Sequence, residues 1–195
     1  MSNTKVFGSP QSRAFRALWM VHELGIPYEN ITDTKKPDYA AVNPNAKVPA
    51  LQDGDVTLFE SMAINLYLAQ KHDKGLWPKN LGDIGRAYQW SFWVMTEVEK
   101  PVLTLLLDVI GMVKATPEAL AEAKKTLEKP FGILDKALAG RDYLLGGNFT
   151  VADLNVASVV AWARGAKYDL ARWPNLLAWL DRCTSRPAAS AARKG

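Results

Sequence analysis

The chain has one cysteine and two histidines among its 195 residues, and this scarcity excludes several kinds of site. A single thiol, Cys183, cannot form a disulfide within the chain or supply the several thiolates of a metal cluster. His22 and His72 lie far apart in the sequence, without the short spacing of metal ligands. We therefore expect neither an internal disulfide nor a bound metal.

Apolar runs long enough to span a membrane are also missing, and the first residues lack a charged stretch followed by an apolar one. The formal net charge is +4, but lysine and arginine are scattered among acidic residues rather than gathered in a basic stripe with aromatic side chains. These features predict a cytoplasmic protein that binds neither membranes nor nucleic acid. The small positive charge favours an anionic small ligand.

What the chain does contain is the composition of a globular protein, 48% hydrophobic and 23% charged, which suffices for one large domain or two small ones. A short strand at residues 5–8 precedes a helical pattern at 13–24, whose apolar side chains occupy more than one side, and a second strand at 28–32. A right-handed crossover through the helix makes these two strands parallel. Residues 35–42 read as a loop with about one helical turn.

The most informative stretch is residues 43–65, NPNAKVPALQDGDVTLFESMAIN. Its Asp53-Gly54 pair separates two short apolar runs, a pattern that predicts a β-hairpin. The hairpin completes a mixed four-stranded sheet, and a helix follows at about 61–72. The order of elements is therefore βαβ and then ββα.

Two places in this stretch are suited to a ligand. Pro49 cannot donate to a sheet ladder, so we expect it at the head of an edge strand, where a cis Val48-Pro49 bond fits. The peptide groups of Val48 are then free to pair with an extended ligand. At the start of the next helix, Ser61 and the first N–H groups suit a carboxylate, whereas Glu60 suits an ammonium group. A ligand with an α-amino acid end and a peptide backbone fits both places.

The pattern NPNAKVPALQDGD followed by LFESMAI resembles the glutathione-binding half of the cytosolic glutathione transferases, whose N-terminal domain is thioredoxin-like. The resemblance implies a cis Pro49 and a Val48 backbone that pairs with the cysteine of glutathione. It also implies that Glu60 and Ser61 hold the γ-glutamyl end. Each dipeptide is common by itself, so the ordered set at this spacing carries the resemblance.

Lysines near this stretch are candidates for the glycine carboxylate of glutathione. Lys47 stands two residues before Pro49, and Lys35 and Lys36 are alternatives for the same role. A loop lysine is also consistent with a solvated side chain.

The chemistry is expected where the first strand meets the first helix. A hydroxyl donor and a helix N-terminus stabilise a thiolate, which activates the thiol by lowering its pKa. Ser12 stands four residues before Arg16, similar to the serine of plant-type transferases, and Ser9 stands four before Arg13, similar to the insect-type arrangement. We favour Ser12, with Ser9 as the alternative; both residues are also consistent with helix caps.

The second half shows no strand pattern. Residues 76–84 read as a linker, and helical spacing covers 84–110, 117–138, 151–166 and 175–184, with Pro101 marking a kink or break. Thr150 and Asp153 form a capping box that is similar to the capping motif of the transferases' C-terminal domain, so we assign Asp153 a structural role. The alanine-rich tail, residues 188–195, is expected to fray.

The sequence thus predicts an α/β thioredoxin-like glutathione-binding domain at 1–75, a linker at 76–84 and an all-α helical-bundle domain at 85–195. The predicted function is that of a glutathione transferase, which conjugates glutathione as co-substrate to a hydrophobic electrophile. Two alternatives stay open: a glutathione-dependent peroxidase or disulfide reductase using the same site, and a non-catalytic binding or assembly module. The resemblance also implies a homodimer.

Overall fold

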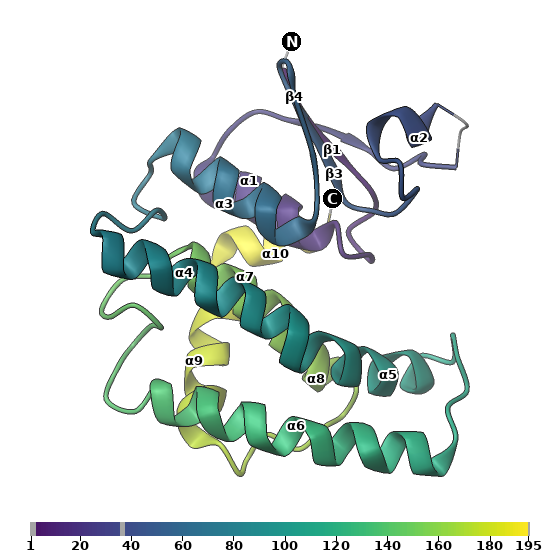
Figure 1. The fold of residues 1–195 in the computed structure, drawn as a ribbon, viewed down its shortest axis with the longest axis vertical. Coiled ribbons are helices and arrows are strands. Elements are labelled where there is room, and N and C mark those ends of the chain that lie inside the picture. Colours follow the sequence, from purple (N-terminus) through teal and green to yellow (C-terminus); the bar gives the residue numbers. More distant parts are fainter. Residues whose placement is uncertain (1–2, 36–37, 195) are drawn as a thin grey trace. The chain divides into compact units, whose positions relative to one another are not determined.

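The computed structural model describes residues 3–35 and 38–194. The chain divides into two compact units (Figure 1): Met1–Trp77 together with Ser185–Gly195, and Pro78–Thr184. The domain limits derived from the sequence stay a prediction. The two divisions differ most in the C-terminal segment, which the structure groups with the first unit.

A four-stranded mixed sheet lies at the centre of the first unit. Its strands are β1 (Thr4–Phe7), β2 (Glu29–Ile31), β3 (Ala50–Asp53) and β4 (Val56–Phe59), in the order β2-β1-β3-β4. Strands β1 and β2 are parallel, with Val6 opposite Asn30, and the other two pairs are antiparallel, with Leu51 opposite both Val6 and Leu58. The predicted βαβ and ββα order and the mixed sheet are confirmed.

Strand β3 corrects one expectation. It is an inner strand between β1 and β4, not an edge strand. Pro49 immediately precedes its first residue, so its missing N–H removes no bond from the ladder. The sequence could not reveal this placement, because the pairing of β1 with β3 joins segments far apart in the chain.

The helices of the first unit are α1 (Phe15–Leu24), α2 (Tyr39–Val42), α3 (Ser61–His72) and α10 (Pro187–Lys194). Helix α1 packs against both α3 and α10, and the side chains of Leu18, Trp19 and Met20 are fully buried. This burial explains why its apolar residues are not confined to one stripe. Gly25 ends the helix in the left-handed conformation, at φ 57°.

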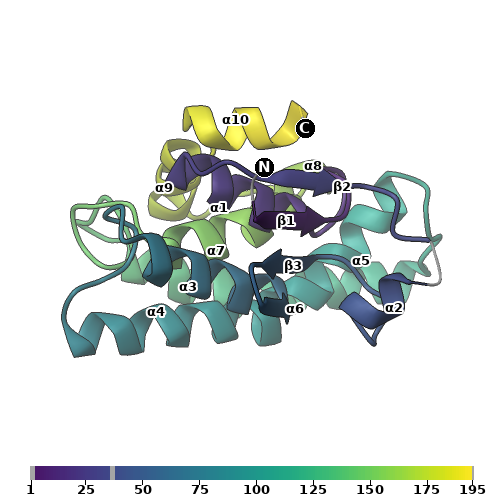
Figure 2. The ribbon, with the colours of Figure 1, turned by 90° about the horizontal axis from the view of Figure 1, so that it is seen from above.

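The C-terminal tail also differs from expectation. Up to residue 194 it forms α10, which lies beside α1 (Figure 2), and Ala189 and Ala192 are fully buried. The expectation of a frayed tail was therefore wrong for these residues. Alanine-rich sequence has a high helix propensity, and its small side chains allow a close approach to a neighbouring helix.

The second unit is all-helical, as predicted. It contains α4 (Leu81–Trp93), a π-helical turn η1 (Val94–Val98), α5 (Glu99–Val109), α6 (Pro117–Ala137), α7 (Val151–Val160), α8 (Trp162–Gly165) and α9 (Pro174–Thr184). Pro101 lies in the first turn of α5, directly after the π-helical turn. Because proline lacks an N–H, the change of hydrogen-bond pattern at this point is where an interruption is expected.

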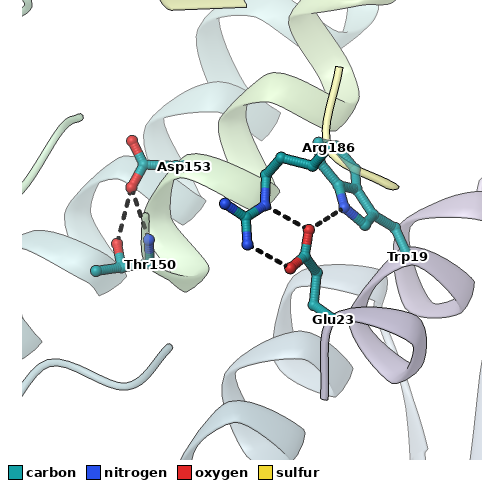
Figure 3. Close-up of polar contacts among 5 residues, drawn as sticks. All are labelled: Trp19, Glu23, Thr150, Asp153 and Arg186. Carbon is teal, nitrogen blue, oxygen red and sulfur yellow. Dashed lines mark hydrogen bonds and ion pairs between the residues drawn. The ribbon is translucent and has the colours of Figure 1, made fainter. Parts of the chain in front are cut away.

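The start of α7 is capped by its own sequence. The N–H and hydroxyl of Thr150 donate to Asp153 at 2.9 and 3.0 Å (Figure 3), and the predicted capping box is confirmed. Asp153 is fully buried and also accepts from the Leu144 N–H at 2.8 Å and the Trp179 Nε1 at 2.9 Å. Burial raises the pKa of Asp153, and the hydrogen bonds from Leu144, Trp179 and Thr150 partly offset that rise. Asp153 therefore links α7 to α9, through Trp179, and to the backbone of Leu144.

Candidate functional site

Gly8 lets three segments of the first unit meet. It follows β1 with a φ of 119°, and a Cβ added there would lie 2.7 Å from the Ala14 Cβ and 2.9 Å from the Val48 Cβ. Only glycine fits this close approach at such a φ. The Asn30 amide donates to the Gly8 carbonyl at 2.9 Å and so fixes the turn. The start of α1 and the segment before Pro49 are thereby brought together.

The two candidate serines lie in the successive turns that lead into α1. The Ser12 hydroxyl donates to the Ser9 carbonyl at 2.7 Å and accepts from the Ala14 N–H at 3.1 Å. The N–H groups of Phe15 and Arg16 bond to carbonyls within the same turns. An anion at this helix start would therefore interact with a hydroxyl and the positive end of the helix, because the N–H groups are already bonded.

Both serines are half-buried, and they differ in what their hydroxyls do. The Ser12 hydroxyl already donates to the Ser9 carbonyl, so it must turn away from that carbonyl to donate to a thiolate. Among the described residues, the Ser9 hydroxyl has no such partner. The choice between Ser12 and Ser9 stays open.

Side-chain hydrogen bonds to the backbone fix the segment before β3. The carbonyl of Lys47 accepts from the Tyr39 hydroxyl at 2.7 Å and the Asn43 amide at 2.6 Å, and the Val48-Pro49 peptide bond is cis. In the part of the chain that the structure describes, nothing is hydrogen-bonded to the peptide groups of Val48. They are thus available to the backbone of an extended ligand.

Helix α3 begins without a side-chain cap. Its first intrahelical bond runs from the Ile64 N–H to the Glu60 carbonyl at 3.0 Å, so the N–H groups of residues 61–63 precede that bond. Glu60 is exposed and has a φ of 73°, which is unusual for a residue other than glycine. Such strained positions cluster at ligand-binding sites.

Arg16 is a site residue that sequence reasoning used only as a spacing marker. It is 1% exposed, and its Nη1 donates to the Ser61 hydroxyl at 3.2 Å. Its positive charge therefore lies behind the start of α3, where it adds to the attraction for a carboxylate. An arginine within the otherwise apolar run of residues 14–21 was the available signal, since arginine is seldom fully buried without a polar partner.

A buried carboxylate fixes α3 on the sheet. Asp53, in β3, accepts from Thr4 at 3.0 Å, Tyr67 at 3.1 Å and Lys71 at 2.6 Å. Burial raises the pKa of Asp53, but the hydrogen bonds from Lys71, Thr4 and Tyr67 outweigh burial, and the pKa lies below its usual value. The last two partners come from α3, so this cluster sets how the helix lies on the sheet.

Neither Lys35 nor Lys47, the two lysine candidates that the structure describes, makes a comparable side-chain contact. Lys47 and Lys35 are both exposed, and Lys36 lies outside the described residues. The structure thus brings Val48 close to Gly8 and Ala14, which flank the turns that carry Ser9 and Ser12, while Ser61 is joined to α1 through Arg16. No group of three or more potential metal ligands is found among the described residues, and no described helix is long and apolar enough to cross a membrane.

The chain is similar to known proteins along most of its length. Residues 2–70 match the N-terminal domain of glutathione S-transferases, and residues 117–182 match their C-terminal domain. Glutathione S-transferase F9 of Arabidopsis thaliana is 32% identical, over 94% of this chain and 93% of its own length. The glutathione S-transferase-like protein gedE of Aspergillus terreus is 30% identical, over 93% of this chain and 90% of its own length.

A solved structure extends the likeness to three dimensions. The theta class glutathione S-transferase of Xanthomonas axonopodis pv. citri, solved with glutathione bound, has a TM-score of 0.89 and 28% identity, covering 100% of this chain and 99% of that one. The fold is a thioredoxin-like unit followed by a helical one. The chain belongs to the glutathione S-transferase family.

Proposed function

We propose that this protein binds glutathione on its first unit, lowers the pKa of the glutathione thiol and adds the thiolate to a hydrophobic electrophile. The observation that carries the proposal is the meeting of the start of α1 with Val48, together with the contact of Arg16 with Ser61. These contacts support the proposal because they join the start of α1, the segment that contains Val48 and the start of α3 within one unit. The reaction forms a carbon–sulfur bond, and the electrophile's leaving group departs or its carbon skeleton takes up a proton.

Each part of glutathione then has a partner. The peptide groups of Val48, next to Pro49, pair with the cysteine backbone, and the γ-glutamyl carboxylate lies at the start of α3 beside Ser61. Glu60 attracts the ammonium group. Lys47, with Lys35 as the alternative, is within the loops expected to face the glycine carboxylate.

The thiolate is stabilised by Ser12, or by Ser9 in its place, and by the positive end of α1. A free thiol has a pKa near 8.5, so only a small fraction is ionised at neutral pH. A hydroxyl donor and a helix end each favour the charged form, and lowering the thiol pKa by about one unit corresponds to about 1.4 kcal/mol.

Calorimetry with glutathione at neutral pH tests the proposal. We expect the wild-type protein to bind with a micromolar to millimolar Kd, and Ser61→Ala to weaken binding by about tenfold, the effect of one hydrogen bond to a charged group. Ser190→Ala, the same change on the exposed side of α10, should leave the Kd unchanged. No detectable binding by the wild-type protein would contradict the proposal.

Substrates separate the remaining alternatives. A bound thiolate could also reduce peroxides or disulfides, so conjugation, peroxide and disulfide substrates should be tested together. Activity towards electrophiles that is lost in Ser12→Ala, and kept in Ser9→Ala, supports conjugation with the serine we favour. Glutathione binding without any of these activities would point to a binding module.

We also propose that the protein is a cytoplasmic homodimer, as the resemblance suggests. Helix α4 exposes Leu81 at 83%, Tyr88 at 39% and Phe92 at 62%, an apolar set that a second copy would cover. Sedimentation of the purified protein measures the assembly, and cell fractionation measures the location.

A further inference from the structure

We propose that α10 is a positioning element of the glutathione site. Arg186, directly before the helix, and Arg193, within it, hold α1 and thereby set where the start of α1 lies against Val48. The inference rests on the proposed function, because the effect we derive is on the thiol of bound glutathione.

The main contact is a two-pronged ion pair. Glu23, near the end of α1, accepts from Arg186 Nε at 2.6 Å and Nη2 at 2.7 Å, and also from Trp19 Nε1 at 2.9 Å (Figure 3). The Glu23 side chain is only 5% exposed. Such a pair between a planar guanidinium and a carboxylate restricts both distance and orientation, unlike a single contact between exposed charges.

A second contact lies at the other end of the same helix. The guanidinium of Arg193 stands 5.1 Å from the ring centre of Phe15, the first residue of α1. At a helical rise of about 1.5 Å per residue, Phe15 and Glu23 are about 12 Å apart along α1. At the same rise, Arg186 and Arg193 are about 10 Å apart along α10. The two helices therefore run antiparallel, and α10 contacts α1 at both ends.

The position of α1 matters most at its start. The Phe15 N–H donates to the Ser12 carbonyl at 3.1 Å, so the residue beneath Arg193 belongs to the turn that carries the candidate serine. The approach of this turn to Val48 is already so close that only glycine fits at residue 8. A small displacement of α1 would therefore change the distance between the thiol-activating hydroxyl and the cysteine of glutathione.

This arrangement predicts which property depends on α10. The γ-glutamyl end is held at the start of α3, whereas α10 contacts α1. Loosening α10 should raise the pKa of the bound thiol more than it weakens recognition of the peptide, because Arg16 is the one group on α1 that we assign to the γ-glutamyl end, whereas Glu60, Ser61 and Val48 lie on other segments. A purely structural role would lower the stability without this selective effect.

The test uses full-length Arg186→Gln and Glu23→Gln. Ultraviolet absorbance of the thiolate, followed against pH, gives the thiol pKa of bound glutathione, and calorimetry with S-methylglutathione gives peptide affinity without the thiol. We expect the thiol pKa to rise by about half a unit or more, the size of a lost helix-end interaction. Affinity for S-methylglutathione should stay within about twofold, because Val48, Glu60 and Ser61 are not altered and Arg16 keeps its hydrogen bond to Ser61. Arg186→Lys should give a thiol pKa between those of wild type and Arg186→Gln. Lysine keeps the positive charge but lacks the planar guanidinium that bonds both oxygens of the carboxylate.

Controls separate the possible failures. Arg172→Gln removes an arginine from an exposed ion pair with Glu128 in the second unit and should change neither property. If Arg186→Gln does not fold, Arg193→Gln removes only the contact with Phe15 from an exposed side chain. An unchanged thiol pKa in a folded variant with a lowered melting temperature would overturn the inference.

Hydrogen exchange in the ligand-free protein makes the test independent of catalysis. The amides of the first turn of α1 should exchange about tenfold faster in Arg186→Gln, because the helix is held less firmly. If wild-type protein fails to bind glutathione, the proposed function fails, and exchange alone decides whether α10 positions α1. Unchanged exchange would reject the positioning role.

Discussion

Helices α3 and α7 begin in opposite ways. The start of α7 is closed: its capping carboxylate, Asp153, is fully buried and accepts hydrogen bonds from Thr150, Leu144 and Trp179. The start of α3 is open: it follows the exposed residue Glu60, has no side-chain cap among the described residues, and begins with N–H groups that precede the first helical bond.

The difference shows how one physical feature serves two purposes. The unpaired N–H groups at a helix start attract a carboxylate. In α7 the chain supplies that carboxylate itself, and the result is stability. At the start of α3 the chain supplies no such carboxylate among the described residues, and Glu60 has a strained φ of 73°; in the function we propose, the carboxylate of glutathione binds here.

The largest expected effect on stability comes from removing the carboxylate that caps α7. Asp153→Ala should lower the free energy of unfolding by at least about 3 kcal/mol, because the buried donors of Leu144, Thr150 and Trp179 lose their acceptor. Urea denaturation measures the change. Asp181→Ala, in the same unit, removes an exposed carboxylate paired with Arg164 and should have little effect. A loss below about 1 kcal/mol would show that the closed start is not the main source of stability.

A smaller effect should come from removing the backbone strain at Glu60, the residue before α3. Glu60→Gly removes the strain of a positive φ and should raise the free energy of unfolding by up to about 1 kcal/mol, the relief being reduced by the flexibility of glycine in the unfolded chain. It should also weaken glutathione binding by about tenfold, because the carboxylate facing the ammonium group is lost. Thermal unfolding and calorimetry measure the two changes.

A matched variant lies in the other unit. Lys167 also has a positive φ, at 55°, so Lys167→Gly should gain stability without any change in glutathione affinity. Equal affinities for wild type and Glu60→Gly would contradict the open-site interpretation.

The smallest effect concerns the buried carboxylate behind α3. The pKa of Asp53 is lowered in the folded protein, so its contribution to stability is present above the pKa of the unfolded chain and is lost as the pH falls below about 4. Burial raises the pKa of Asp153, so the pH dependence of its contribution to stability is opposite to that of Asp53. The contribution of Asp153 declines as the pH rises. Lys71→Gln should reduce the acid-dependent loss by about 1 kcal/mol or less, because the lysine side chain is 42% exposed.

Melting temperatures of wild type and Lys71→Gln between pH 3 and 7 provide the measurement. The two curves should converge at the acid end, where Asp53 is protonated in both proteins. Parallel curves would show that the Lys71 contact does not set the pKa of Asp53.

Local patterns made much of this fold predictable. The Asp53-Gly54 turn, the helical spacing and the Thr150–Asp153 capping box each depend on residues close together in the sequence, and the structure confirms them. The inner position of β3 and the docking of α10 depend on contacts between distant segments, which no local pattern reveals. The contact of Arg16 with Ser61 joins residues 45 positions apart, so the sequence showed the arginine but not its partner.

The position of α10 has a consequence for how the protein is made. The ribosome synthesises the sheet and α1 first, then the whole second unit, and only afterwards Arg186 and the helix that covers α1. Until then Glu23 is a carboxylate without its guanidinium partner, and one side of α1 lacks its covering helix. The first unit is therefore the first to begin folding and the last to be completed.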